Sequence, residues 1–142
     1  MKNKKILLWL DDYRDPTTSS FLQKYVPDHS AYKIVWVKSY NEFCKWITDN
    51  GLPSKIAFDH DLADEHYAPP ESYKNYNEWA ESQNFSEKTG MDCVKWLVDY
   101  CLDNKVQLPN WVCHSANPAG VENMSGLLKS FMKFQIKNDI IS

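Results

Sequence analysis

The chain has 142 residues and 43% of them are hydrophobic, which is enough to bury one core, so a single domain over residues 1–142 is expected. Its formal net charge is −3, whereas a protein that holds long duplex DNA through its phosphates needs clustered Lys and Arg. Composition therefore excludes an electrostatic binder of long nucleic acid. A small phosphorylated ligand or a nucleic-acid terminus is still compatible with this composition.

The sequence predicts a soluble, cytoplasmic protein that does not enter a membrane. The apolar run 6–10 is too short for the core of a signal peptide, and no apolar stretch reaches the roughly 20 residues that cross a bilayer. The four cysteines form no CxxC or CxxH pair, which argues against a disulfide framework and against a zinc site. We expect buried thiols in a reducing compartment.

The first predicted elements are a buried strand and a helix. Residues 6–10 form an unbroken apolar run, which is typical of a strand buried on both faces, and the run ends at Asp11 and Asp12. Asp15 is followed directly by proline, as at many helix N-termini, so a helix is predicted from there to about Pro27.

A second strand and a second helix follow. Residues 32–37 are rich in β-branched and aromatic side chains, which favours a strand. Ser39, with Glu42 three places later, has the spacing of a capping box that opens a helix, and Gly51 is expected to end this helix.

The third strand leads into a segment rich in acids and histidine. Residues 55–58 form a short apolar strand that runs into Asp-His-Asp at 59–61. Residues 63–88 contain two prolines and little periodicity, so they are predicted to be a loop insertion of the kind that often forms a lid. Its His66, like His29 earlier in the chain, is expected to be solvated. Its aromatic residues could close over a base or ribose, and they include Tyr67, Tyr73, Tyr76 and Trp79.

The last predicted elements are a helix, a strand and a helix. A helix is expected from Gly90, because apolar residues recur at helical spacing over the next turns. A fourth strand at 111–113 ends at His114 and Ser115, and a turn at 116–120 then leads into a final helix.

Strands that alternate with helices predict an α/β fold: a flavodoxin-like three-layer sandwich with a parallel sheet of about four strands, order 2-1-3-4, and helices on both faces. In such a sheet the ligand crevice lies beyond the carboxyl ends of the strands. Three of the four strands end in acids or histidine, and with this order they are neighbours. One small rim is therefore predicted to hold Asp11, Asp12, Asp59, His60, Asp61, His114 and Ser115.

Clustered carboxylates repel one another unless protons or a cation intervene, and hard oxygen ligands suit Mg²⁺ or Mn²⁺ better than zinc. A divalent metal is therefore expected. Such an ion neutralises phosphate oxygens, while histidine transfers protons near neutral pH, so the pattern indicates phosphoryl or phosphodiester chemistry. Each aspartate taken singly could simply cap a turn, and the agreement of three strand ends is what favours a site.

Four segments carry a resemblance to a known family. ILLWLDDYRDP, FDHDL, TGMDCVKWLVDY and HSANPAGVENM resemble the cyclic-phosphate-processing receiver-like domains, over most of the chain apart from the insertion and the tail. The resemblance implies a fold similar to response-regulator receivers. It also implies a role in processing cyclic phosphate ends, as in RNA repair or nucleotide-based conflict systems.

By this resemblance the receiver's acidic pair corresponds to Asp11 and Asp12, its phosphate-accepting aspartate to Asp59, and its strand-four hydroxyl to Ser115. A signalling receiver also has a lysine after a fifth strand. This chain has little room for that strand, and Lys137 is a poor match for that lysine.

The leading hypothesis is a metal-dependent phosphoesterase that opens a cyclic phosphate on a nucleotide or RNA terminus. The expected metal ligands are Asp11, Asp12 and Asp59. The expected catalytic residues are His60 and His114 as acid and base, Asp61 as the residue that orients one histidine, and Ser115. The expected substrate-binding residues are Arg14, Asn117, Glu122 and Asn123.

Two other functions stay open at this point. One is a non-catalytic receiver-like module that binds a cyclic nucleotide or a partner protein. The other is a phospho-accepting switch, which the missing lysine disfavours. A helical HD-type phosphohydrolase is disfavoured because its His-Asp pair lies on helices, whereas here the pair follows a strand. The sequence does not determine the oligomeric state.

Overall fold

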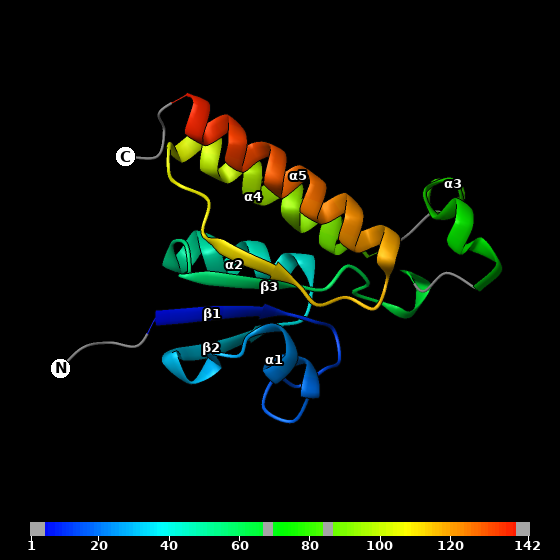
Figure 1. Cartoon of the computed structure of the whole chain (residues 1–142), viewed down its shortest axis with the longest axis horizontal. Helices are drawn as coiled ribbons and strands as arrows, with labels where there is room; N and C mark the ends of the chain where they lie inside the picture. Colours follow the sequence, from blue (N-terminus) through cyan, green and yellow to red (C-terminus); the bar gives the residue numbers. More distant parts are fainter. Residues whose placement is uncertain (1–4, 67–69, 84–86, 139–142) are drawn as a thin grey trace.

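The fold is a four-stranded parallel sheet covered by helices on both faces (Figure 1). The computed structural model describes residues 5–66, 70–83 and 87–138. The strands are β1 (Lys5–Leu10), β2 (Tyr32–Val37), β3 (Lys55–Phe58) and β4 (Asn110–Cys113). Their order is β2-β1-β3-β4 and every neighbouring pair is parallel, so the predicted topology is confirmed.

The helices are α1 (Ser20–Tyr25), α2 (Tyr40–Asn50), α3 (Tyr76–Ser82), α4 (Gly90–Asn104) and α5 (Pro118–Lys137). Helices α2, α4 and α5 pack on one face of the sheet and α1 on the other. In β1, successive residues point to opposite faces, so Leu8 and Leu10 join the first core while Leu7 and Trp9 join the second. Among the described residues, no helix is both long and apolar enough to cross a membrane.

The first helix begins later than predicted. The Asp15 carboxylate accepts hydrogen bonds from the backbone N–H and the hydroxyl of Thr17, which closes a local turn instead of capping a helix. Ser19 is the N-cap, because its hydroxyl accepts the N–H of Phe21, and α1 then ends at Tyr25. The start predicted at Asp15 was therefore wrong.

The insertion is not a structureless loop. It contains short 3₁₀ turns at Asp64–His66 and Pro70–Asn75, followed by α3. His66 is fully buried: its Nδ1 accepts the N–H of Leu62 and its Nε2 donates to the carbonyl of Glu87, so the expectation of a solvated histidine was wrong. The carboxylate of Glu65 accepts the N–H of Glu87. These bonds hold the two ends of the insertion together.

Two glycines let α4 and α5 approach the turn after β3. A Cβ at Gly90 would collide with the carbonyl oxygen of Asp59 and lie 2.8 Å from the Cα of His60, and a Cβ at Gly120 would lie 2.7 Å from the Cβ of His60. The Gly90 N–H also donates to the His60 carbonyl at 2.7 Å. Any side chain at these positions would displace the residues after β3.

Gly90→Ala should therefore destabilise the protein by ~1 to 3 kcal/mol, because the new methyl group meets backbone that cannot rotate away. Urea unfolding measures the change. Gly126→Ala is the matched control: nothing lies within 4 Å of its Cβ position inside α5, so this variant should gain ~0.5 to 1 kcal/mol. Equal effects at both positions would contradict the close approach.

Candidate functional site

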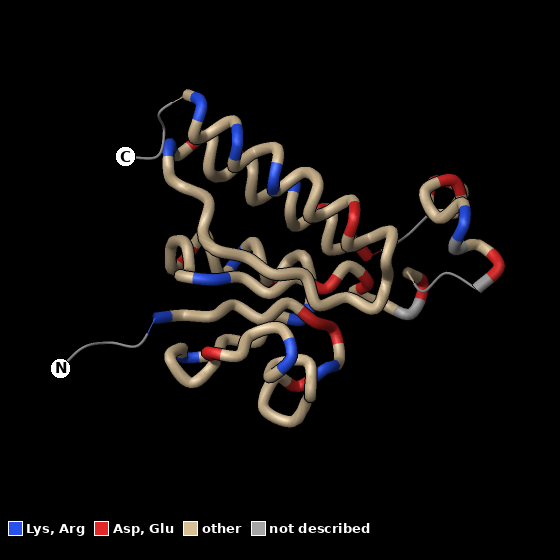
Figure 2. Tube along the Cα trace, in the orientation of Figure 1, with Lys and Arg blue, Asp and Glu red and all other residues tan. Residues whose placement is uncertain are grey.

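Acidic residues gather where the strands end. Figure 2 shows Asp and Glu at the carboxyl ends of β1 and β3, which is the edge where a parallel α/β sheet binds its ligands. The structure divides the residues predicted at this edge into two hydrogen-bonded groups. We call them the carboxylate group, which consists of Asp11, Arg14, Asp59 and His114, and the His60 group, which consists of His60, Asp61, Tyr76 and Asn117.

Asp11 is fully buried and both of its oxygens are occupied. Oδ1 accepts the backbone N–H groups of Tyr13 and Arg14, at 3.1 and 2.9 Å. Oδ2 accepts from the Arg14 guanidinium at 3.2 Å and from His114 Nε2 at 3.0 Å. Burial by itself would raise the pKa of Asp11, but the bonds from His114, Arg14 and Tyr13 outweigh burial and lower it. Asp11 is therefore ionised at neutral pH.

Arg14 bridges the two buried carboxylates. Its Nη1 lies 3.2 Å from Asp11 Oδ2 and 3.5 Å from Asp59 Oδ2, and its side chain is only 13% exposed. The guanidinium also lies over the rings of Tyr13 and Phe21, at 4.7 and 4.5 Å from their centroids. Arg14 was predicted to bind substrate, and in the structure its contacts are with the carboxylates.

Asp59 is the least neutralised member of the carboxylate group. Burial, with the negative charge of Asp11, raises the pKa of Asp59 to about 8, although Arg14 and the hydroxyl of Ser115 act in the opposite direction. Asp59 therefore carries a proton in much of the protein at neutral pH. Ionising Asp59 lowers the stability of the folded protein, because it adds a buried negative charge. A bound cation would offset that charge.

This raised pKa predicts a pH dependence of stability in the metal-free protein. Between the usual value of 3.8 and about 8, the folded state holds a proton on Asp59 that the unfolded state has lost, so stability falls as pH rises through this window. The slope for one proton is at most about 1.4 kcal/mol per pH unit. Asp59→Asn keeps the neutral form, so urea unfolding from pH 6 to pH 8 should favour the variant increasingly. A constant difference would contradict the shift.

His114 is buried among aromatic rings and cannot touch a substrate. Its side chain is 0% exposed and its ring stacks on Trp9, with centroids 4.0 Å apart, beside Phe21 and Tyr25. Burial lowers the pKa of His114 despite the bond to Asp11, so the ring is neutral and Nε2 carries the proton it donates. The predicted role of His114 as acid or base is therefore corrected: it positions Asp11.

Three of these side chains could hold a divalent ion. Asp11, Asp59 and His114 each offer a ligand atom, and the atoms lie within 4.8 Å of one another. Asp12, which was predicted as a ligand, is not a member of this group. Asp11 Oδ2 bonds Arg14 and His114 in this group, whereas Asp12 supplies no ligand atom to the set. His114 takes the place that the prediction gave to Asp12.

The His60 group lies on the side of α4 and α5. His60 Nδ1 lies 2.7 Å from Asp61 Oδ1, and because a carboxylate only accepts hydrogen bonds, Nδ1 carries the proton. Nε2 is then the basic nitrogen of the ring. Asn117, the N-cap of α5, donates to Asp61 at 3.2 Å, and the hydroxyl of Tyr76 lies 3.4 Å from His60 Nδ1. The prediction that Asp61 orients a histidine agrees with this geometry.

The predicted single rim is thus two adjoining groups. Asp59 and His60 are neighbours in the chain and point to opposite sides, Asp59 toward Arg14 and His60 toward Gly120 and Tyr76. Ser115 lies between the groups, because its hydroxyl lowers the pKa of Asp59 and also accepts the N–H of Asn117.

His60 lines a pocket of about 440 Å³ between α3, α4 and α5. Among the predicted substrate-binding residues, Asn123 lines this pocket, whereas Glu122 is exposed and lines a different hollow. Tyr76 also lines it. Tyr76 was predicted among the aromatic residues of the insertion that could close over a base or ribose, but not among the catalytic, metal or substrate-binding residues. The side chains of Tyr67 and Tyr73 lie outside the described part of the chain.

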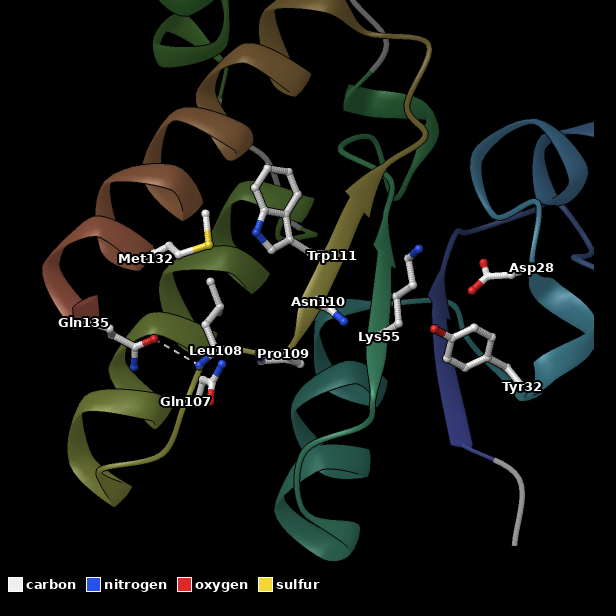
Figure 3. A pocket seen from close by; sticks show the side chains of 10 residues that line it. All are labelled: Asp28, Tyr32, Lys55, Gln107, Leu108, Pro109, Asn110, Trp111, Met132 and Gln135. Carbon is white, nitrogen blue, oxygen red and sulfur yellow. Dashed lines mark hydrogen bonds between the residues drawn. The ribbon is translucent and has the colours of Figure 1, made fainter. Parts of the chain in front are cut away.

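A second pocket, of about 480 Å³, lies at the opposite edge of the sheet (Figure 3). Its lining includes Tyr32, Lys55 and Asn110, the first residues of their strands. Gln135 of α5 is fully buried beside it. Its Oε1 accepts the N–H of Leu108 and its Nε2 donates to the carbonyl of Val106, so it anchors the segment between α4 and β4 to α5. Because no acid or histidine cluster converges there among the described residues, we assign the chemistry to the carboxyl edge.

The site does not suit a phospho-accepting switch. Arg14 is the cation that contacts Asp59, whereas Lys137 lies exposed in the last turn of α5, at the end of the helix far from the carboxyl edge (Figure 1). The lysine that such a switch needs is therefore not provided by Lys137.

Comparison with known proteins agrees with the fold. The model of the cyclic-phosphate processing receiver domain family matches residues 6–130, which include all of β1 after its first residue and both groups of the site. No curated protein and no solved structure matches the chain. The chain belongs to the cyclic-phosphate processing receiver domain family.

Proposed function

We propose that the protein is a phosphoesterase that hydrolyses a cyclic phosphate, such as the 2′,3′-cyclic phosphate of a nucleotide or an RNA terminus. The observation that carries this proposal is the His60–Asp61 pair, bonded at 2.7 Å, in which His60 lines a pocket at the carboxyl edge of the sheet. A histidine whose tautomer is fixed by a carboxylate is suited to general acid–base catalysis. The family supplies the class of substrate.

The reaction needs one proton removed and one returned. His60 Nε2 takes a proton from water as the water oxygen forms a bond to phosphorus, and the bond from phosphorus to the 2′ or 3′ oxygen breaks. The protonated ring then returns that proton to the leaving oxygen, so one water is consumed and a phosphomonoester remains. Asp61 stabilises the imidazolium formed between these steps, as the carboxylate of a hydrolase triad does.

The chain provides hydrogen-bond donors beside His60. Asn117 caps α5 by accepting the N–H of Gly120, which fixes its amide beside Asp61 and His60. The amino terminus of this long helix favours a negatively charged group, so we place the phosphate near it.

The carboxylate group would hold a divalent metal in this proposal. Two carboxylates and an imidazole within 4.8 Å fit such an ion, and burial with the charge of Asp11 raises the pKa of Asp59 to about 8 although Arg14 lies beside it, which supports a role for a further cation. Oxygen-rich sites of this kind favour Mg²⁺ or Mn²⁺. When bound, the ion would offset the charge of Asp59 and Asp11 next to the His60 group. In the metal-free protein His114 donates Nε2–H to Asp11, and to hold the ion that nitrogen would have to release its proton.

The test is incubation with 2′,3′-cyclic nucleotides in chelator, in Mg²⁺ and in Mn²⁺, followed by chromatography of the products. The proposal expects a phosphomonoester, formed faster with one of the metals. Binding of intact ligand without product would instead support a non-catalytic receiver-like module. Failure to convert 2′,3′-cyclic nucleotides and an RNA ending in a cyclic phosphate would sink the proposal.

A further inference from the structure

We propose that the pocket beside His60 binds the nucleoside part of the substrate, and that Asn77 and Asn123 recognise its base. This inference rests on the proposed function, because His60 determines where the phosphate lies. The pocket holds about 440 Å³, within the roughly 300 to 1,000 Å³ typical of small-molecule sites. The insertion supplies one wall through α3, and α4 and α5 supply the others.

The wall next to His60 is aromatic. The ring of Tyr76 meets the ring of His60 edge to face, with centroids 5.7 Å apart, and is itself only 4% exposed. Trp79 lies behind it, with ring centroids 5.8 Å apart. Aromatic surface beside a phosphate-directed histidine suits the sugar and base of a nucleotide. The hydrogen bonds of His66 to Leu62 and Glu87 secure the base of the insertion that carries this wall.

The two asparagines join the insertion to α5 at the pocket. Asn123 Nδ2 donates to Asn77 Oδ1 at 2.9 Å. That bond does not use the amide N–H groups of Asn77 or the carbonyl oxygen of Asn123, so a donor and an acceptor remain on these two residues. A donor and an acceptor of this kind match the edge of a nucleobase, which carries the complementary pair.

The charges that line the pocket divide it along its length. Lys95 on α4 provides a positive charge for a phosphate, whereas Glu81 at the end of α3 disfavours one. Asp92 also lines the pocket, but its carboxylate accepts the N–H and the hydroxyl of Thr89 in the capping box of α4. The phosphate is thus expected beside His60 and away from Glu81, and the asparagines are left to contact the base.

The experiment is calorimetric titration of the protein with nucleoside 3′-monophosphates, which have no cyclic phosphate left to hydrolyse. Their affinity is compared with that of ribose phosphate, which lacks a base. A base should improve affinity by about tenfold or more, and Asn77→Ala should remove most of that gain. Asn75→Ala is the matched control, because it also deletes an asparagine amide, but outside this pocket. Asn75 is the residue before α3, and its side chain makes no capping hydrogen bond to that helix. It should bind like the wild type.

Equal affinity with and without a base, or equal losses in the two variants, would overturn the inference. Its failure is distinguishable from that of the proposed function. Base-dependent binding without hydrolysis of the cyclic phosphate would support base recognition and contradict the proposed function. Hydrolysis that does not depend on the base would contradict base recognition alone. A short RNA ending in the same 3′-phosphate, titrated in parallel, shows whether the nucleoside comes from a mononucleotide or a chain terminus.

Discussion

Replacing His60 with alanine should lower kcat/KM for cyclic phosphate hydrolysis by about 10² to 10⁴, the usual contribution of a positioned acid–base group. The reason is that the His60 ring is the imidazole at the carboxyl edge that both lines the pocket and has its tautomer fixed by a carboxylate. Steady-state kinetics with a 2′,3′-cyclic nucleotide measures the loss. Asp61→Asn should cause a smaller loss, because the ring remains and only its orientation and charge stabilisation change.

The matched control is His29→Ala, which removes an imidazole from the 3₁₀ turn His29–Ala31, just before β2, and outside both groups of the site. It should keep wild-type kinetics. His60→Ala that keeps more than about a tenth of the activity, while its circular dichroism shows a folded protein, would contradict the role of His60. His114→Ala distinguishes the roles of the two histidines. Because His114 positions Asp11, this variant should lower the stability of the fold, and any loss of activity should accompany that change.

Replacing Arg14 with alanine should destabilise the metal-free protein by ~3 to 5 kcal/mol, because it removes the buried cation that pairs with the ionised Asp11 and also contacts Asp59. Urea unfolding in chelator measures this change. Mg²⁺ or Mn²⁺ should then raise the melting temperature of Arg14→Ala more than that of the wild type, because the ion no longer competes with the guanidinium.

Lys45→Ala is the control for a lost ion pair. Lys45 and Asp49 are bonded at 2.8 Å, but their side chains are 78% and 54% exposed, so their loss should cost less than about 1 kcal/mol. If Arg14→Ala resembled this control, the bridge would not stabilise the fold. If divalent ions stabilised neither wild type nor Arg14→Ala, the carboxylate group would not be a metal site.

The architecture could be predicted because strand patterns and strand ends are local features. Residues 32–37 and 55–58 became strands within the predicted bounds, since β-branched and apolar runs report directly on burial in a parallel sheet. Strand order then brought three strand ends together. The start of α1 was missed because the Asp15 carboxylate closes a turn with Thr17 instead of capping a helix. The local sequence is compatible with both hydrogen-bonding patterns and does not distinguish them.

The site was harder to predict because it depends on side-chain direction and on long-range contacts. Proximity along the chain indicated one cluster, but Asp59 and His60 face opposite sides. The burial of His114 depends on its stacking with Trp9, which is distant in sequence, and the position of Arg14 depends on the turn that follows Asp11. The place of Tyr76 beside His60 required the whole path of the insertion, which has no periodicity to predict it.

The most direct test of the central claim is phosphorus NMR of a 2′,3′-cyclic nucleotide incubated with the protein in water enriched in oxygen-18. We expect the cyclic phosphate signal to be replaced by one phosphomonoester carrying a single heavy oxygen, and His60→Ala, but not His29→Ala, to slow this conversion. A cyclic phosphate signal that persists unchanged with the wild-type protein and divalent metal would contradict it.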